Sequence, residues 1–187
     1  MAKYSQKRFF IGIVPPEEIL NGLDRSVSLY KRESWAEHVK WVKPANLHLT
    51  LKFLGNVNTN NLDSLLSVIQ AAISPIASFE SEVTGLKIFP KPSRPSVISA
   101  GITGNTDLPG VVRIIEDVLE NEGYPREKRA FRGHITLGRC KKSFPRAQKI
   151  SDIIKSYSFT VNEIIIFSSI LKPDGPEYFA ENKIALS

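Results

Sequence analysis

Cysteine is almost absent from this chain, since Cys140 is the only one among its 187 residues. A single cysteine cannot form a disulfide within the chain, and this excludes the disulfide-stapled class of small secreted domains. A reducing setting is therefore the expected environment, and we predict a cytoplasmic location.

Long apolar runs are missing as well. Basic residues precede the apolar run 9–14, as they would in a leader peptide, but this run is short and ends at Pro15-Pro16. No other stretch approaches the length that a membrane-spanning helix needs. We therefore expect a soluble protein that has no membrane partner.

Acidic residues are in deficit, with 19 Asp and Glu against 25 Lys and Arg, a net charge of +6 and a pI near 9.4. This excess is compatible with an anionic partner such as nucleic acid, a phosphate ester or a membrane surface, without choosing among them. The 42% hydrophobic content is ordinary for a globular protein. We expect one domain, 1–187, built of two closely joined lobes and present as a monomer.

Histidine is scarce, and two of the three histidines stand in a repeated frame. The frame is His-x-Thr-Leu, and its copies begin at His48 and at His134, 86 residues apart. Apolar and polar residues alternate in both copies, which is typical of half-buried strands. The third histidine, His38, lies outside any repeat and is predicted to be a surface residue.

Alternation predicts which side chains share a face of each strand. In the first copy His48, Thr50 and Lys52 are expected on one face, and the leucines and Phe53 on the other. In the second copy His134 and Thr136 share a face. Each strand therefore offers an imidazole and a hydroxyl side by side.

Periodicity and turn residues predict the remaining elements. The predicted strands cover residues 7–14, 46–55, 79–89, 97–102, 133–139, 161–171 and 178–185. The predicted helices cover residues 17–31, 62–73, 107–122 and 146–155. Each His-x-Thr strand follows a strand and a helix and precedes a further helix. This order favours an α+β, bilobal protein of two pseudo-symmetric α/β lobes, whose antiparallel sheets face a central cleft that carries both His-x-Thr motifs.

Two imidazoles across a cleft suit the hydrolysis of a phosphodiester. In an in-line displacement the attacking and leaving oxygens lie on opposite sides of phosphorus, so a base and an acid are needed on opposite sides. Histidine serves both tasks because its unperturbed pKa of roughly 6.5 keeps both protonation states accessible. Thr50 and Thr136 would donate hydrogen bonds to the non-bridging oxygens, and a strained cyclic phosphate would need neither metal nor cofactor.

Two nearby cations are candidate phosphate contacts. Lys52 lies on the expected histidine face of the first strand, and Arg139 lies just past the second motif. Either charge could stabilise the phosphoryl oxygens. Strict alternation would place Arg139 on the face opposite His134, so the strand must end or twist for Arg139 to reach the cleft.

The paired motifs resemble those of the two-histidine (2H) phosphoesterases, and most closely those of the RNA 2′,3′-cyclic phosphodiesterases, historically called 2′-5′ RNA ligases. The resemblance extends over most of the chain, through the segments 8–16, 41–55 and 89–101. Two departures are visible. Gly133 stands where a proline commonly precedes the second histidine, and Ser99 where an aromatic residue is common, which could alter the packing near the substrate's base.

The resemblance implies metal-independent hydrolysis of RNA 2′,3′-cyclic phosphate ends to 2′-phosphomonoesters in a bilobal cleft. It also implies roles for individual residues: His48 as proton donor, His134 as proton acceptor and Arg139 as a phosphate contact. Reversal of the reaction would join RNA ends through a 2′-5′ linkage.

Other functions remain compatible with the sequence. The same chemistry could act on another cyclic or 2′-5′ linked nucleotide. The chain could also be a basic RNA-binding module without turnover, although a binding module would not require both intact His and Thr pairs. A metal site made of His48, His134 and Cys140 is disfavoured because the frame lacks convergent acidic ligands and the usual zinc spacing.

Overall fold

The structure is a computed structural model that describes residues 6–104, 107–146, 148–173 and 175–187. Its strands are β1 (Gln6–Ile13), β2 (Val39–Trp41), β3 (Leu49–Asn58), β4 (Phe79–Lys91), β5 (Arg94–Gly104), β6 (His134–Cys140), β7 (Tyr157–Val161), β8 (Glu163–Lys172) and β9 (Gly175–Ala185). Its helices are α1 (Glu17–Tyr30), α2 (Leu62–Ile73) and α3 (Asp107–Asn121), with short 3-10 turns η1 (Ala36–His38), η2 (Pro44–Asn46) and η3 (Thr59–Asn61).

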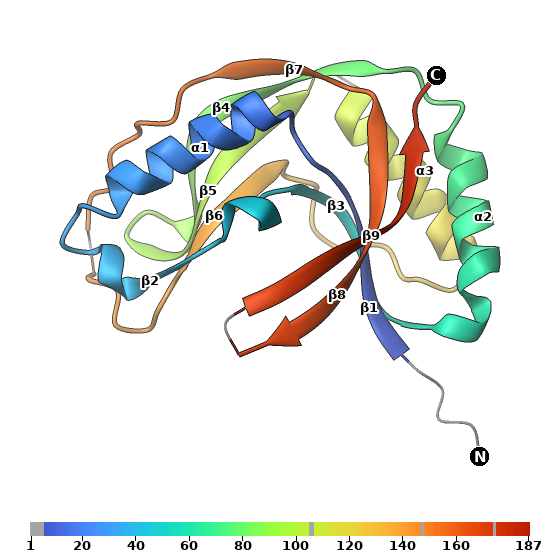
Figure 1. Cartoon of the computed structure of the whole chain (residues 1–187), viewed down its shortest axis with the longest axis horizontal. Helices are drawn as coiled ribbons and strands as arrows, with labels where there is room; N and C mark the ends of the chain where they lie inside the picture. Colours follow the sequence, from blue (N-terminus) through green and yellow to red (C-terminus); the bar gives the residue numbers. More distant parts are fainter. Residues whose placement is uncertain (1–5, 105–106, 147, 174) are drawn as a thin grey trace.

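Within the described residues the strands form one curled antiparallel sheet (Figure 1). Its order is β7-β4-β5-β6-β3-β1-β8-β9, and the short β2 pairs with β6. The two central strands, β6 and β3, pair through Leu49 and Ile135. The sheet therefore consists of two four-stranded halves that meet at a narrow junction.

The two halves repeat one arrangement. In one, β1 leads through α1 to the central strand β3, and in the other β5 leads through α3 to the central strand β6. The prediction of an α+β protein with two pseudo-symmetric lobes is confirmed. The boundaries predicted for α1, α2 and α3 hold to within a residue.

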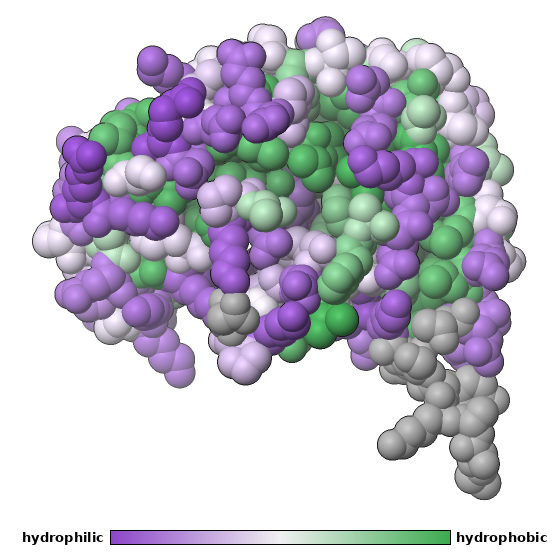
Figure 2. Space-filling model, viewed as in Figure 1, coloured by the Kyte–Doolittle hydropathy of each residue, from purple (hydrophilic) through white to green (hydrophobic). Residues whose placement is uncertain are grey.

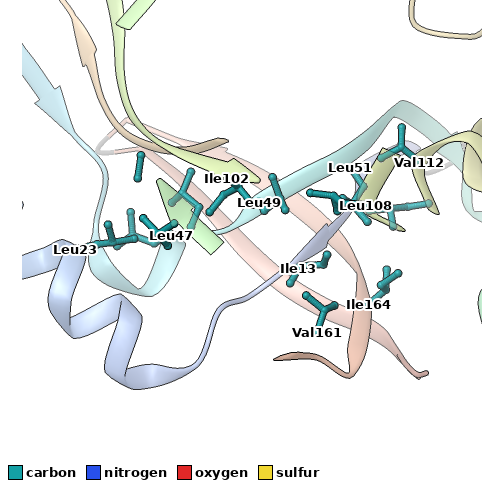
Figure 3. Close-up of a cluster of buried hydrophobic side chains, with 14 of the residues drawn as sticks. Ile13, Leu23, Leu47, Leu49, Leu51, Ile102, Leu108, Val112, Val161 and Ile164 are labelled. Carbon is teal, nitrogen blue, oxygen red and sulfur yellow. The ribbon is translucent and has the colours of Figure 1, made fainter. Parts of the chain in front are cut away.

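The core explains which face of each motif strand is left for chemistry. Leu49 and Leu51 of β3 and Ile135 and Leu137 of β6 are nearly inaccessible and belong to one cluster with the apolar stripes of the helices. Part of this cluster is drawn in Figure 3. Because successive strand residues point to opposite faces, burying the leucines turns the intervening histidine and threonine of each motif away from the core.

A second, smaller apolar cluster contains Phe10, Ile165 and Phe167, with Tyr178 packed against it. It combines neighbouring strands, because Phe10 of β1 is directly opposite Phe167 of β8 in the sheet register. The Phe10 ring lies 4.7 Å from the ring of His48. This cluster therefore supports the first motif histidine.

The helix predicted at 146–155 is wrong, since the described residues of this segment form neither helix nor strand. Tertiary hydrogen bonds satisfy its polar groups, because the Tyr30 hydroxyl donates to the Ser151 carbonyl and the Asp152 carboxylate accepts from the Leu86 amide. The helical spacing also predicted that Ile150, Ile153 and Ile154 face inward; Ile150 and Ile154 are buried, whereas Ile153 is exposed. Long-range contacts thus replace the i to i−4 bonds of a helix.

Within the part of the chain that the structure describes, no helix combines the length and the apolar character needed to cross a membrane.

Candidate active site

A pocket of about 180 Å³ opens between the two halves of the sheet. Its walls come from the β2–η2 segment, from the central strands β3 and β6, and from the tip of the β8–β9 hairpin. Among its lining residues are five of the six that the sequence predicted: His48, Thr50, His134, Thr136 and Arg139. Residues far apart in the chain are thereby brought into one site, which we call the cleft pocket.

Both histidines are held in the same way by their own backbone. The Nδ1–H of His48 donates to the carbonyl of Asn46 at 2.8 Å, and that of His134 donates to the carbonyl of Arg132 at 2.8 Å. A carbonyl only accepts, so its partner Nδ1 must carry the proton, and this assigns the tautomer. Nε2 is therefore the ring nitrogen that does not bind the backbone and carries no proton in the neutral ring of each copy.

His48 is the more enclosed of the two histidines. Its Nε2 lies 3.0 Å from the Thr50 hydroxyl, and its ring meets Tyr178 edge-on at 5.1 Å between ring centroids. The ring of His134 lies 5.1 Å from that of Phe89, on the other side of the site. An aromatic wall thus stands behind each imidazole.

Burial lowers the pKa of His48 below its ordinary value of 6.5, because removal from water disfavours the charged imidazolium. The hydrogen bond to Asn46 opposes this shift, and the positive charges of His134 and Arg139 add to it. The neutral form of His48 is therefore favoured in the free protein.

A bulge interrupts the alternation of each motif strand one residue after the threonine. In β3, Thr50 is opposite Gly12 and Lys52 is opposite Ile11, so Leu51 has no partner of its own in the ladder. In β6, the corresponding interruption falls at Leu137. A bulge inserts one extra residue and thereby reverses the faces of the residues that follow it.

The bulges decide which side chains reach the cleft pocket. Arg139, five residues after His134, returns to the histidine face and lines the pocket, as the prediction of a twist required. Phe53, five residues after His48, does the same and is 69% exposed. The prediction from simple alternation, which placed Phe53 on the core side, is therefore wrong.

Lys52 does not line the cleft pocket, and its predicted place on the histidine face is wrong. Its side chain is buried, and Nζ donates to the Glu116 carboxylate at 2.8 Å and to the Pro125 carbonyl at 2.6 Å. Glu116, on α3, also accepts from the Glu127 amide. Lys52 thus ties α3 and the segment before β6 to β3, and this structural position keeps it away from a ligand in the pocket.

Comparisons with known proteins identify the family of this chain. A family model described as LigT like Phosphoesterase matches residues 13–99, which include the first His-x-Thr motif. A relative from Archaeoglobus fulgidus, named RNA 2′,3′-cyclic phosphodiesterase, is 32% identical over 158 residues, which cover 80% of this chain and 85% of the relative. The chain belongs to the LigT-like phosphoesterase family. It is therefore a member of a family of phosphoesterase enzymes.

Further comparisons also extend over most of the chain. A Methanocaldococcus jannaschii relative with the same name is 30% identical over 177 residues, which cover 91% of this chain and 96% of the relative. The crystal structure of a Thermus thermophilus protein superposes with a TM-score of 0.83 at 26% identity, over 95% and 97% of the two chains. That of Escherichia coli LigT complexed with 3′-AMP gives a TM-score of 0.81 at 23% identity, over 98% and 99%, and this likeness shows the fold.

Several residues of this LigT-like site escaped prediction. Tyr178 comes from β9 near the far end of the chain, and burial raises its pKa while the charge of Arg139 opposes the rise. Lys40 lies in β2 directly opposite Arg139 and lines the same pocket. The β8–β9 hairpin is held over the site by the Asn46 side-chain amide, which donates to the Pro176 carbonyl at 2.8 Å. No local sequence signal marks these residues, because strand pairing brings them together.

The two departures from the family pattern lie outside the pocket's lining. Ser99 is fully buried, and its hydroxyl donates to the Lys87 carbonyl. At Gly133 an added Cβ would come within 2.7 Å of the Ile102 carbonyl oxygen, so close packing favours glycine there.

Cys140 also lies away from the cleft pocket, opposite Val39 in the β2–β6 ladder, and burial raises the pKa of its thiol. Within the described ranges no group of three or more His, Cys, Asp and Glu side chains is arranged to hold a metal ion.

Proposed function

We propose that the protein hydrolyses RNA 2′,3′-cyclic phosphate ends to 2′-phosphomonoesters by acid–base catalysis with two histidines. The observation that supports this most directly is the matched presentation of His48 and His134 in one pocket, each with Nδ1 bound to the carbonyl two residues earlier and with no backbone group bound to Nε2. The names of the Archaeoglobus and Methanocaldococcus relatives support the same reaction and substrate.

In the proposed reaction, Nε2 of His134 accepts a proton from a water molecule whose oxygen attacks phosphorus. The bond from phosphorus to the 3′ oxygen breaks as the new bond forms, and Nε2 of His48 donates a proton to that oxygen. The product keeps the phosphate on the 2′ oxygen. Acid and base thus act on opposite sides of phosphorus, as an in-line displacement requires.

The donor role of His48 must be reconciled with its lowered pKa. In the free protein burial and the neighbouring positive charges favour the neutral imidazole. A bound phosphodiester brings a negative charge beside the ring, which favours the charged form and raises the pKa of His48. Substrate binding would therefore favour protonation of His48, and this proton is the one that the leaving oxygen receives.

Thr50, Thr136 and Arg139 are proposed to hold the phosphoryl group. All three line the same pocket as the histidines. The hydroxyls would donate to the non-bridging oxygens, and the guanidinium of Arg139 would stabilise the charge that builds up on them. Phe53, with its exposed ring at the pocket, offers an apolar surface on which a base could stack.

The proposal is tested with a short RNA that ends in a 2′,3′-cyclic phosphate, incubated with the protein in the presence of EDTA. The wild type should yield a 2′-phosphate end, identified by ³¹P NMR, whereas His48→Ala and His134→Ala should yield far less of it in the same time. His38→Ala is a matched control because His38 bonds to Ser143 away from the pocket, and it should keep full activity.

A 3′-phosphate product would contradict the proposed roles, since it requires cleavage of the other bond. A loss of activity in EDTA that added metal restores would contradict the metal-independent mechanism. If the wild type converted nothing but the double histidine variant still bound the RNA, the RNA-binding alternative would replace the catalytic proposal.

A further inference from the structure

A second hollow lies at the far end of the β4–β5 hairpin, outside the cleft pocket. It has a volume of about 270 Å³ and is lined by Lys91, Ser93 and Arg94 from the hairpin turn and by Arg146 from the segment after β6. We call it the hairpin hollow. In Figure 1 this turn lies on the left, on the side of β2 and of the end of β6, and Figure 2 shows hydrophilic residues gathered at this end of the molecule.

The hairpin hollow is positively charged and no carboxylate lines it. None of its three cations forms an ion pair with a described residue, whereas Arg126 elsewhere is held by both Asp117 and Glu120. The chain between positions 139 and 149 carries five basic residues and no acidic one. Three converging cations without a counter-charge repel one another, so an anion placed between them is stabilised.

Strand register places the hollow close to the cleft pocket. Arg139 is paired with Val97 of β5, and Arg94 lies three residues before Val97 in the same strand. At a rise of about 3.3 Å per residue this separation is roughly 10 Å along the strand. The adjacent strand β4 also runs from the cleft pocket to the hollow. Its Phe89 contacts the ring of His134, and Lys91 lies two residues after Phe89.

We propose that the hairpin hollow binds a phosphodiester of the RNA strand upstream of the reacting end. This inference rests on the proposed function. A 2′,3′-cyclic phosphate stands at the 3′ terminus of an RNA, so every further phosphate lies on its 5′ side. A chain that leaves the cleft pocket past Phe89 and Val97 reaches the hollow within a short single-stranded stretch.

The chemistry of the hollow suits a backbone phosphate and not a base. A guanidinium presents paired N–H donors that match two phosphate oxygens, and Arg94 and Arg146 supply two such groups. Ser93 adds a hydroxyl donor, and Lys91 adds a point charge. Contacts of this kind position a strand without reading its sequence. The protein should therefore act better on oligonucleotides than on nucleoside cyclic phosphates, whatever the RNA sequence.

The inference is tested by comparing two substrates, a nucleoside 2′,3′-cyclic phosphate and a short single-stranded RNA with the same end. The variant Arg94→Ala/Arg146→Ala should lose roughly tenfold in kcat/KM on the RNA, the size expected for two exposed charge contacts, mainly through KM. It should act normally on the nucleoside substrate. The salt dependence of RNA binding should also weaken, by about 0.7 in the log–log slope for each phosphate that the variant no longer neutralises.

The matched control removes the same charge elsewhere. Arg25→Ala/Arg113→Ala changes two exposed arginines on α1 and α3 that line neither the cleft pocket nor the hollow. This control should leave both substrates unaffected. An equal loss on RNA in the control and the test variant would overturn the inference, because it would show a general charge effect.

Binding is measured separately, so that a failure of the proposed function is told apart from a failure of this inference. Fluorescence anisotropy with the same RNA bearing a 3′-phosphate gives its dissociation constant without turnover. Weaker binding in the Arg94→Ala/Arg146→Ala variant than in the control supports RNA binding by the hairpin hollow, even if the wild type hydrolyses neither substrate. Equal binding in wild type and variant overturns it even if hydrolysis is observed.

Discussion

His48 and His134 stand in two strands of the same design. In each, Nδ1 donates to the carbonyl two residues earlier, a threonine follows two residues later, and a bulge comes directly after the threonine. The copies differ beyond the bulge. The fourth and fifth positions after the histidine are Lys52 and Phe53 in one strand, and Gly138 and Arg139 in the other.

This difference shows how one backbone geometry is adapted to two surroundings. Lys52 turns into a buried ion pair with α3. The corresponding Gly138 faces β2 so closely that an added Cβ would meet a Val39 methyl group at 2.5 Å. The fifth position reaches the cleft pocket in both strands, where it presents an aromatic ring in one case and a positive charge in the other. Two similar strands thus form an asymmetric site, as a substrate with a base on one side and a phosphate on the other requires.

The largest effect is expected from removing the feature that the two strands share. His48→Ala and His134→Ala should each lower kcat by about 10²–10⁴-fold, because each removes one proton transfer. The double variant should lose about as much as either single variant, since the two groups act as a unit. Single-turnover kinetics measure this. Additive losses would show that the two histidines act in separate steps.

The next effect concerns the fourth position, where only the first strand carries a charge. Lys52→Met should lower the free energy of unfolding by about 3–5 kcal/mol, because Glu116 would remain as an uncompensated buried charge. Lys52→Met/Glu116→Leu should recover much of this loss. Urea denaturation followed by circular dichroism measures both. Equal destabilisation by the single and double variants would mean that the pair contributes little beyond packing.

At the fifth position, Arg139→Gln should lower kcat/KM by about 10- to 100-fold, because a charge on the phosphoryl oxygens is lost. It should also move the bell-shaped profile of kcat/KM against pH. The positive charge of Arg139 contributes to the lowered pKa of His48, so its removal raises that pKa and moves the alkaline limb of the profile, which His48 sets as the proposed general acid, to higher pH. The remote variant Arg113→Gln should leave the profile in place. If the profile of kcat/KM against pH were the same in Arg139→Gln and in the wild type, the charge of Arg139 would not affect the pKa of His48.

The smallest effect is expected at the counterpart of Arg139 in the first strand. Phe53→Ala should raise KM for an RNA cyclic phosphate by about tenfold through lost stacking, with kcat nearly unchanged. Its exposed ring adds little to the core, so the melting temperature should stay within a few degrees. Ile170→Ala provides a control, because Ile170 is also exposed but does not line the pocket. A fall in kcat instead would assign Phe53 a part in positioning the reacting group.

Much of the fold and the centre of the site were predictable from the sequence. The repeated His-x-Thr frame, the burial of its leucines and the three helices follow from local periodicity, which a single strand or helix expresses in its own residues. The family resemblance added the expectation that His48 is the proton donor and His134 the proton acceptor, which the residues alone do not indicate. The places of Lys52 and Phe53 were not predictable, because a bulge is a property of a strand pair. Its location depends on the partner strand, β1 for the first motif and β5 for the second.

The segment 146–155 shows the same limit for helices. Its isoleucines have helical spacing, yet it forms no helix, and Tyr30 and Leu86, both distant in the chain, bind the Ser151 carbonyl and the Asp152 carboxylate. The course of the segment brings Arg146 to the turn of the β4–β5 hairpin. Local pattern cannot express such contacts, since they exist only once the lobes have formed.

By itself the sequence determined the candidate catalytic residues, because two copies of one short frame are visible without any knowledge of their arrangement. The tertiary structure alone decided which neighbours those residues have. Pairing of β3 with β6 and of β2 with β6 placed both histidines and Arg139 in one pocket, and the returning β8–β9 hairpin added Tyr178. The physical reason is that pKa, charge and access depend on distances through space, whereas the sequence orders residues only along the chain.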